Sequence, residues 1–269
     1  MIEPVVLGWV TPGTVSSRFM DSVLRFVFAS AGEVQLGNRT DHVIAGYKFI
    51  ESGPRIASAR NRLVREFLEE PTFKDVEWLL MLDTDMVFDE KLLPALFQEV
   101  RDSEGKIQRP IVGGLCFGGG RGKVFPTMYQ IVDPKTHGGK SVITVDEWTD
   151  GAAVEVDATG AACLLVHRGV YEAMHERIGE PVPWFAESIY GGAEFGEDWT
   201  FCLRARGMGY PIYVNTNAKV GHQKSIVMDE QFWRDGSVPL ETKVPRETPS
   251  APVVPMNREQ RRAKQARSR

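Results

Sequence analysis

The chain has 269 residues, 42% of them hydrophobic and 25% charged, which is the composition of a soluble globular protein with one large α/β domain or two small ones. No apolar run reaches the roughly 20 residues that a membrane-spanning helix needs, so we expect no membrane span. The net charge of −4 divides into +5 for residues 257–269 and −9 for the remainder, which excludes a nucleic-acid-binding surface on the body and leaves the basic segment to contact an acidic partner.

The first part of the chain predicts strands and helices in alternation. Residues 5–10, VVLGWV, have the composition of a strand, and we expect a helix over about 16–30. Residues 42–50 are β-like because they are rich in β-branched and aromatic side chains, whereas 55–70 carry the apolar stripe of a helix. The most apolar segment, VEWLLMLDTDM over 76–86, is typical of a strand buried on both faces of a parallel sheet.

The rest of the chain predicts a less regular arrangement. Asp89 is expected to cap a helix over 91–102, and a strand is expected over 111–117. Gly-rich loops and short β-like pieces then extend to about residue 158. The last expected elements are a strand over 161–168, helices over 169–179 and 197–209, and a closing β segment over 211–222. Two βα units followed by a mixed β region indicate one open, doubly wound α/β domain, in which ligands bind at the carboxyl ends of the strands.

Domain limits and compartment follow from the ends of the chain and from its cysteines. We expect the domain to span residues 1–237 and the Pro-rich, basic segment 238–269 to be a disordered tail. The N-terminus, MIEPVVLGWV, has an acid where a signal peptide has basic residues, which predicts no export. Cys116, Cys163 and Cys202 are odd in number and form no CxxC pair, which argues against a disulfide framework or a zinc site. We therefore expect a cytoplasmic protein.

Two carboxylates stand at the end of the apolar segment, in LLMLDTDM. Asp83 and Asp85 are separated only by Thr84, and carboxylates so close together repel each other unless they share a cation. Mg²⁺ or Mn²⁺ is the natural cation, because it prefers oxygen ligands and is commonly held by one or two carboxylates plus substrate phosphates. The structural alternative is an Asx turn, in which each Asp bonds a nearby backbone N–H.

The same residues satisfy a second functional pattern. DTDMV is similar to the DxDx(T/V) motif of haloacid-dehalogenase-like phosphatases, which would make Asp83 the nucleophile and Asp85 the acid. That motif normally lies on the first strand of its fold, whereas two βα units precede it in this chain. No later GDxxxD pair completes such a site. A phosphatase therefore stays the alternative to a metal and diphosphate site.

Four segments in order resemble the signature of GT-A-fold glycosyltransferases, particularly the inverting family 2 group. GEDWTFCLRARGMGYPIYVNTNAKVGH (196–222) is similar to the family's run in which an ED pair opens a helix and a His follows a strand. ASARNRLV (57–64) resembles the family's ARN helix, and LLMLDTDM (79–86) its strand entering the DxD metal motif. VDATGAACLLVHRGVYE (156–172) resembles the segment in which a Gly-Ala turn precedes an apolar strand. The resemblance covers about residues 4–225.

The resemblance implies a single GT-A, Rossmann-like domain with a mixed sheet and a site for a divalent cation and a UDP- or GDP-sugar. Asp85 would bind Mn²⁺ or Mg²⁺, Asp83 would contact the ribose or the metal, and His222 would be a further ligand through its neutral imidazole. The nucleotide-binding half would be about 1–117 and the acceptor half about 118–237. The donor-binding residues implied are Thr11, Pro12, Gly13, Arg60, Asp83, Thr84 and Gly114.

The acceptor side has its own candidates. Asp198 is the candidate general base of an inverting transfer, and Glu197 is the alternate, although both would also stabilise a helix N-terminus by about 1 kcal/mol. Trp184, Tyr190 and Trp199 bracket the expected acceptor loop, where aromatic faces suit a sugar or a peptide. Whether the acceptor is a protein, a glycan or a lipid stays open.

We therefore expect a cytoplasmic, metal-dependent glycosyltransferase of the hexosyltransferase type that moves one sugar from a nucleoside-diphosphate donor to a hydroxyl. A nucleotide-sugar-binding module without catalysis is a further alternative. The chain departs from the family pattern in three places. WVTPGT (9–14) replaces the commoner end of the first strand, no QxxRW follows the His, and YGGAEFGED (190–198) is similar to retaining relatives that glycosylate polypeptides.

Overall fold

A computed structural model describes one compact unit, which ends at Lys224. The described residues are 2–31, 33–36, 39–120, 123–179, 184–190 and 193–224. The expected tail over 238–269 and the last part of the expected domain, 225–237, lie outside them. Within the described ranges, no helix has the length and apolar character needed to cross a membrane.

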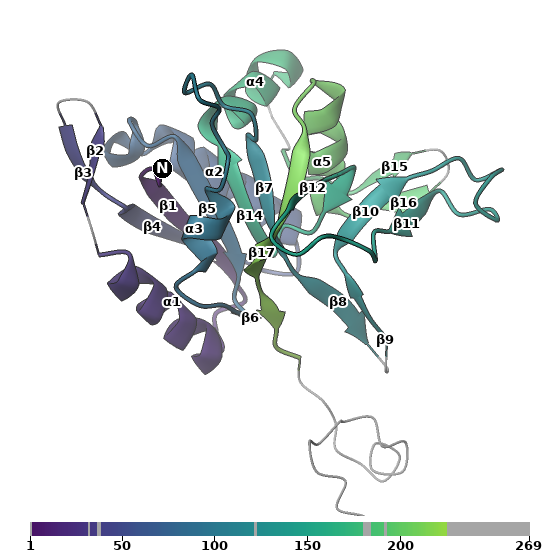
Figure 1. The fold of residues 1–269 in the computed structure, drawn as a ribbon, viewed down its shortest axis with the longest axis horizontal. Coiled ribbons are helices and arrows are strands. Elements are labelled where there is room, and N and C mark those ends of the chain that lie inside the picture. Colours follow the sequence, from purple (N-terminus) through teal and green to yellow (C-terminus); the bar gives the residue numbers. More distant parts are fainter. Residues whose placement is uncertain are drawn as a thin grey trace, which may run out of the picture. The chain divides into compact units, whose positions relative to one another are not determined.

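The centre of this unit is a seven-stranded mixed sheet with the order β12-β17-β7-β14-β5-β1-β4 (Figure 1). Its strands are β1 (Val5–Thr11), β4 (Ile44–Glu51), β5 (Trp78–Asp83), β7 (Ile111–Leu115), β12 (Ala153–Val156), β14 (Cys163–His167) and β17 (Ile212–Lys219). β1 runs parallel to β4 and β5, and β17 runs parallel to β7. β14 is antiparallel to both of its neighbours, and β12 is antiparallel to β17.

Helices cover both faces of this sheet, as expected for a doubly wound domain. They are α1 (Ser17–Ala29), α2 (Ile56–Glu69), α3 (Leu92–Leu96), α4 (Arg168–Ile178) and α5 (Glu197–Gly207), with a 3₁₀ turn, η1 (Pro71–Phe73), after α2. The apolar sides of α2, α4 and α5 share one core cluster, and those of α1 and α3 share the other. Successive residues of β5 alternate between the two, because Leu79 belongs to the first cluster and Leu80 to the second. The α/β fold class with a mixed central sheet, expected of a GT-A domain, is confirmed.

Short strands decorate the large sheet. They are β2 (Glu33–Leu36) with β3 (Arg39–His42), β6 (Met86–Val87) with β18 (Gly221–His222), β8 (Phe117–Gly120) with β9 (Lys123–Pro126), β15 (Ser188–Tyr190) with β16 (Ala193–Phe195), and β10 (Met128–Ile131) between β11 (Val142–Thr144) and β13 (Ala158–Thr159). The pair of β6 and β18 matters most for the site, because it places His222 opposite Met86, next to the second Asp of DTD.

The helix expected over 91–102 is wrong beyond Leu96. The expected cap is also wrong, because Lys91 is the N-cap and Asp89 lies before it, where Oδ1 of Asp89 accepts a hydrogen bond from the backbone N–H of Lys91 (2.9 Å). The carbonyl of Ala95, however, accepts a hydrogen bond from the side-chain amide of Asn215 (2.7 Å). Glu99 then has a positive φ of 55°, which a continuing α-helix does not allow. A tertiary contact and a left-handed residue therefore end the helix after five residues.

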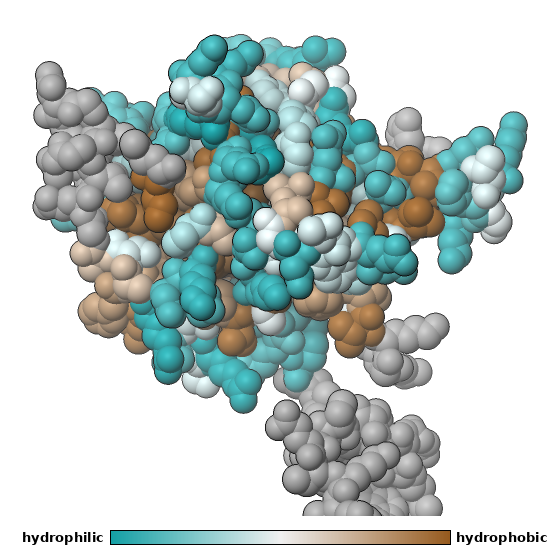
Figure 2. Space-filling model, viewed as in Figure 1, coloured by the Kyte–Doolittle hydropathy of each residue, from teal (hydrophilic) through white to brown (hydrophobic). Residues whose placement is uncertain are grey.

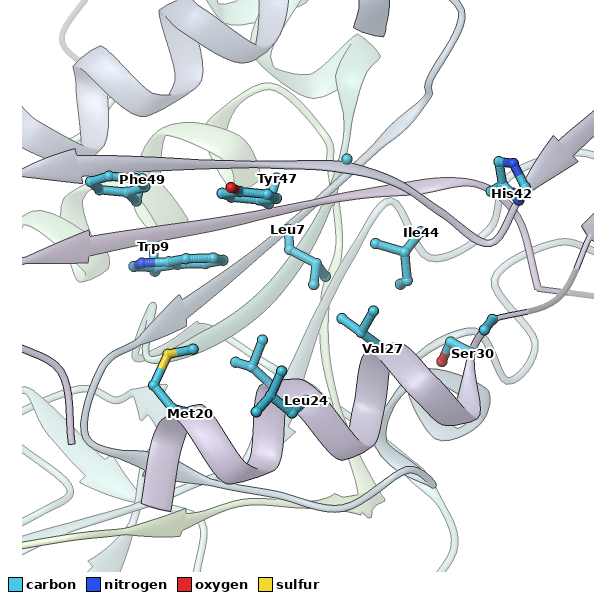
Figure 3. Close-up of a pocket in the computed structure, with 13 residues that line it drawn as sticks. Leu7, Trp9, Met20, Leu24, Val27, Ser30, His42, Ile44, Tyr47 and Phe49 are labelled. Atoms are coloured by element: carbon cyan, nitrogen blue, oxygen red, sulfur yellow. The ribbon is translucent and has the colours of Figure 1, made fainter. Parts of the chain in front are cut away.

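An apolar cavity of about 730 Å³ opens between α1 and the edge of the sheet formed by β1 and β4 (Figure 3). The ring of Trp9 stacks on those of Tyr47 and Phe49, with centroids 5.5 and 6.2 Å apart. Hydrophobic surface is also visible over part of α1 and over the hairpin of β8 and β9 (Figure 2), where Phe28 and Val124 are exposed. None of the site residues expected from the sequence lines this cavity.

Candidate functional site

The candidate site lies where β1 and β5 end. Val10 is paired with Asp83 across these two strands, so Thr11 and the DTD turn leave the sheet at the same edge. Asp83 is the last residue of β5, and its five predecessors are buried apolar residues. Asp83 itself is half-buried, and a carboxylate in such a position needs a polar partner.

Arg60 supplies that partner from the buried face of α2. Its side chain follows the helical stripe that also contains Leu63 and Phe67, and only 4% of the residue is exposed. Nη2 of Arg60 donates to Oδ1 of Asp83 (2.8 Å), and Nη1 donates to Oε1 of Glu197. Burial alone would lower the pKa of Arg60, but the charges of these carboxylates raise it above its ordinary value.

Asp198 lies beside this ion pair in the first turn of α5. One of its oxygens, Oδ1, accepts a hydrogen bond from the backbone N–H of Trp199 (2.8 Å). A side chain added at Gly160 would lie 3.6 Å from the other oxygen, Oδ2, so the missing side chain there leaves space beside the carboxylate. Burial and the negative charge of Glu197 raise the pKa of Asp198, while Arg60 acts in the opposite direction. This combination is that of a carboxylate able to accept a proton.

Asp85 faces the other way, toward β18. Oδ2 of Asp85 lies 2.9 Å from Nε2 of His222 and 3.2 Å from Nζ of Lys224. The second ring nitrogen of His222, Nδ1, lies 2.9 Å from the carbonyl oxygen of Phe117, which can only accept, so Nδ1 carries a proton. A lone pair on Nε2 cannot face the carboxylate alone, because both would be acceptors. A cation shared by the two atoms would satisfy both.

These two side chains fit a divalent cation that takes its other ligands from phosphates. A ligating His typically donates its second N–H to a backbone carbonyl, as His222 does to Phe117. Within the described ranges, no group of three or more His, Cys, Asp or Glu side chains is arranged to hold a metal. Asp83 in particular is engaged by Arg60 instead. One carboxylate and one imidazole then remain, and one or two carboxylates plus phosphates are a usual Mg²⁺ environment. A cation bound there would have to displace the ammonium of Lys224 from Oδ2 of Asp85.

The residues expected to line the nucleotide pocket form a turn at the end of β1. The hydroxyl of Thr11, which is buried, donates to the carbonyl of Thr14 (2.9 Å) and accepts from the N–H of Gly13 (3.2 Å). Gly13 has a φ of 95°, and a side chain there would lie 3.2 Å from a carboxylate oxygen of Glu51. Pro12 and Gly13 are exposed, as a ligand pocket would require. Thr84 is half-buried in the DTD turn.

Gly114 is not part of this surface. It is buried in the middle of β7, and a side chain there would lie 2.9 Å from Sγ of Cys163 and 3.1 Å from the carbonyl oxygen of Ala218. Protein atoms fill the space next to Gly114, so packing of the strand explains the missing side chain. The expectation that Gly114 contacts the donor has no support in this geometry.

Substitution of Gly114 by alanine should therefore destabilise the fold. We expect the free energy of unfolding to fall by about 1–3 kcal/mol, because an overpacked core must shift backbone or side chains. Urea denaturation of both variants measures this, with Gly53→Ala as the matched control, since nothing lies within 4 Å of a side chain added there. A Gly114→Ala variant as stable as the wild type would mean that the space is free for a ligand.

The aromatic residues expected on the acceptor side have different environments. Trp184 is 1% exposed, and its indole N–H donates to the carbonyl of Tyr171 (3.0 Å), so it is a core residue and offers no face to an acceptor. Trp199 is half-buried, and its ring centroid lies 4.4 Å from that of Tyr129. The side chain of Tyr190 lies outside the described part of the chain.

Three polar residues of the site were not expected. Tyr129 packs its ring against that of Trp199, and burial and the charge of Asp198 raise the pKa of its hydroxyl. Asn61 exchanges two hydrogen bonds with the backbone of Phe185 (2.7 and 2.8 Å). Lys224 pairs with Asp85. Of the three, only Asn61 belongs to a motif identified in the sequence, because it is the last residue of ARN.

No protein-family model matches the chain, and no curated protein matches it in sequence. Among solved structures, A197 from STIV matches with 17% identity, 84% of this chain, 97% of that chain and a TM-score of 0.45. GalNAc-T7 with UDP, GalNAc and Mn²⁺ matches with 12% identity, 84% of this chain, 44% of that chain and a TM-score of 0.48.

A glycosyltransferase involved in the glycosylation of the major capsid of PBCV-1 matches with 13% identity, 67% of this chain, 69% of that chain and a TM-score of 0.33. Identities of 12–17% and TM-scores below 0.5 leave the functional argument to the side chains of the site.

Proposed function

We propose that the protein is a metal-dependent glycosyltransferase that transfers a single sugar from a nucleoside-diphosphate-sugar to an acceptor hydroxyl with inversion. The observation that carries the proposal is that four carboxylates of the site, Asp83, Asp85, Glu197 and Asp198, have different partners. Arg60 holds Asp83 and Glu197, His222 faces Asp85, and Asp198 keeps space beside one oxygen. Together with the four family-like segments in order, this arrangement supports transfer chemistry better than the phosphatase alternative, whose nucleophile, Asp83, is held by the buried Arg60.

In the proposed reaction Asp198 accepts the proton of the acceptor hydroxyl. The hydroxyl oxygen forms a bond to the anomeric carbon while the bond from that carbon to the diphosphate oxygen breaks on the opposite face. The nucleoside diphosphate leaves with the bonding electron pair, and the proton remains on Asp198 until it passes to solvent. The raised pKa of Asp198 suits this role, because a stronger base is a better proton acceptor.

The donor diphosphate would lie at the end of β5, next to Asp85 and His222. A divalent cation held there by these two side chains would offset the negative charge that develops on the departing diphosphate. Lys224 adds a positive charge beside Asp85. Pro12, Gly13 and Thr84 would line the nucleoside side of the same edge, and Trp199 and Tyr129 would flank the acceptor next to Asp198.

A thermal-shift panel tests donor recognition. UDP, GDP and their sugar conjugates, each with and without Mn²⁺, should include one that raises the unfolding temperature only when Mn²⁺ is present. A ligand at 100 times its Kd adds about 2.7 kcal/mol to the stability of the folded state. ADP serves as the control for unspecific diphosphate binding. No shift with any of these compounds would contradict the proposal.

A further inference from the structure

Two adjacent residues of α2 reach across to the acceptor side of the domain. Arg60 donates to Glu197 at the start of α5, and Asn61 exchanges two hydrogen bonds with the backbone of Phe185. The ring of Phe185 stacks on that of Phe201, which lies one turn further along α5, with centroids 4.8 Å apart and planes 13° from parallel. The start of α5 is therefore fixed to α2 by an ion pair and by a segment that packs on it.

The position of Arg60 makes this ion pair costly to lose. The guanidinium is almost fully buried, and its Cζ lies 5.9 Å from the centre of the Phe185 ring. Breaking a buried pair by removing one partner leaves an uncompensated charge in the core, which is strongly destabilising. The Glu197 side chain is 16% exposed and that of Asp83 is 29% exposed, so Arg60 neutralises two carboxylates that water reaches poorly.

The ion pair also distinguishes two neighbouring carboxylates. Glu197 and Asp198 follow each other in the first turn of α5, and both could serve as a base by residue type. Oε1 of Glu197 accepts a hydrogen bond from Arg60, whereas Oδ1 of Asp198 accepts one from a backbone N–H of its own turn. A carboxylate that accepts a hydrogen bond from a buried arginine is held in one orientation, so Arg60 keeps the Glu197 carboxylate turned toward α2.

We propose that Arg60 is a positioning residue that holds Glu197 out of proton transfer and fixes the start of α5 so that Asp198 faces the acceptor. The role rests on the proposed glycosyl transfer. It differs from a contact between Arg60 and the donor diphosphate, since each terminal nitrogen of the guanidinium donates to a carboxylate and the side chain is only 5% exposed.

Steady-state kinetics of Arg60→Gln, Arg60→Lys and Glu197→Gln test this role. Loss of the guanidinium should lower kcat on the order of 10²-fold with little change in the KM of the donor, because a small misplacement of the base is enough to have such an effect. Arg60→Lys should recover part of kcat, since an ammonium can hold one of the two carboxylates. The double variant Arg60→Gln/Glu197→Gln should have a kcat no lower than Arg60→Gln alone, because Arg60 acts through Glu197.

Arg168, which is half-buried, is the control for loss of an arginine that packs against the core. Its side chain is 12% exposed and donates to backbone carbonyls that include Val76 (3.0 Å) and Phe73 (2.6 Å). Arg168→Gln should lower the unfolding temperature and leave kcat of the folded protein unchanged.

The outcomes separate the two proposals. Wild-type protein that releases no nucleoside diphosphate from any donor would overturn the glycosyl transfer and the role of Arg60 with it. An active wild type with Arg60→Gln at the wild-type kcat would overturn the role of Arg60 alone. A raised donor KM at unchanged kcat would also overturn it, because that result would mean a direct contact between Arg60 and the donor.

Discussion

Replacement of Asp198 by asparagine is expected to lower kcat by about 10²–10⁴-fold, the usual contribution of a positioned general base. Asparagine keeps the shape of the side chain and its hydrogen bond from the N–H of Trp199 but cannot accept the proton of the acceptor. The rate of nucleoside-diphosphate release in the presence of an acceptor measures the effect.

Stability gives this variant an internal check. Burial raises the pKa of Asp198, so the folded state binds the proton more tightly than the unfolded chain and the ionised group opposes folding at neutral pH. Asp198→Asn should thus be as stable as the wild type or more stable at pH 7. Asp157, whose carboxylate pairs with Arg206 at 2.7 Å, is the matched control, because Asp157→Asn should lose stability and keep kcat. A wild-type rate in Asp198→Asn would contradict the assignment of the base.

The same shift sets the direction of the pH dependence. A base must be ionised to act, so kcat should fall as the pH is lowered through the raised pKa of Asp198, above the ordinary value of 3.8. Asp198→Asn should lose this acidic limb. An acidic limb that persists unchanged in the variant would assign it to another group.

Replacement of His222 by glutamine, or of Asp85 by asparagine, is expected to lower the affinity for Mn²⁺ in the presence of a nucleoside diphosphate. We expect a loss of at least about 10–100-fold, because loss of a residue that only hydrogen-bonds a metal ligand already has an effect of that order. Calorimetric titration measures it without reference to turnover. Binding in the wild type should also weaken on acidification, because the imidazole must be neutral to coordinate.

His137 is the control for this experiment. It lies on an exposed loop, where its ring nitrogen contacts the hydroxyl of Thr136 (2.8 Å). His137→Gln should bind Mn²⁺ as the wild type does. Equal affinities in the wild type and His222→Gln would contradict the proposed cation site.

The sequence predicted the middle of the fold well, because the main strands and helices carry their own patterns. β5 is a run of buried apolar residues, and α2 has a continuous stripe that includes Leu63 and Phe67. Elements decided by contacts with distant residues were not predictable in the same way. The early end of α3 depends on the amide of Asn215, which lies 120 residues away in the chain.

In the site, too, the motifs predicted some features, whereas others depend on tertiary packing. The order of the motifs predicted that the DTD turn, the ED pair and His222 belong to one site, and the structure places Asp83, Glu197 and Arg60 in contact. Residue type alone could not assign Trp184, because an aromatic side chain suits a core as well as a sugar. Residue type alone also did not reveal that Arg60 is buried. Its place on the apolar stripe of α2 was a signal of burial, and a buried arginine needs a carboxylate partner.

The most direct test of the central claim is the identity of the leaving group. Wild-type protein with Mn²⁺, an acceptor mixture and each UDP- and GDP-sugar in turn should release the nucleoside diphosphate from one donor, detected by anion-exchange chromatography, and Asp198→Asn should not. Release of inorganic phosphate from a phosphate monoester, dependent on Asp83 and without nucleoside diphosphate from any donor, would contradict glycosyl transfer.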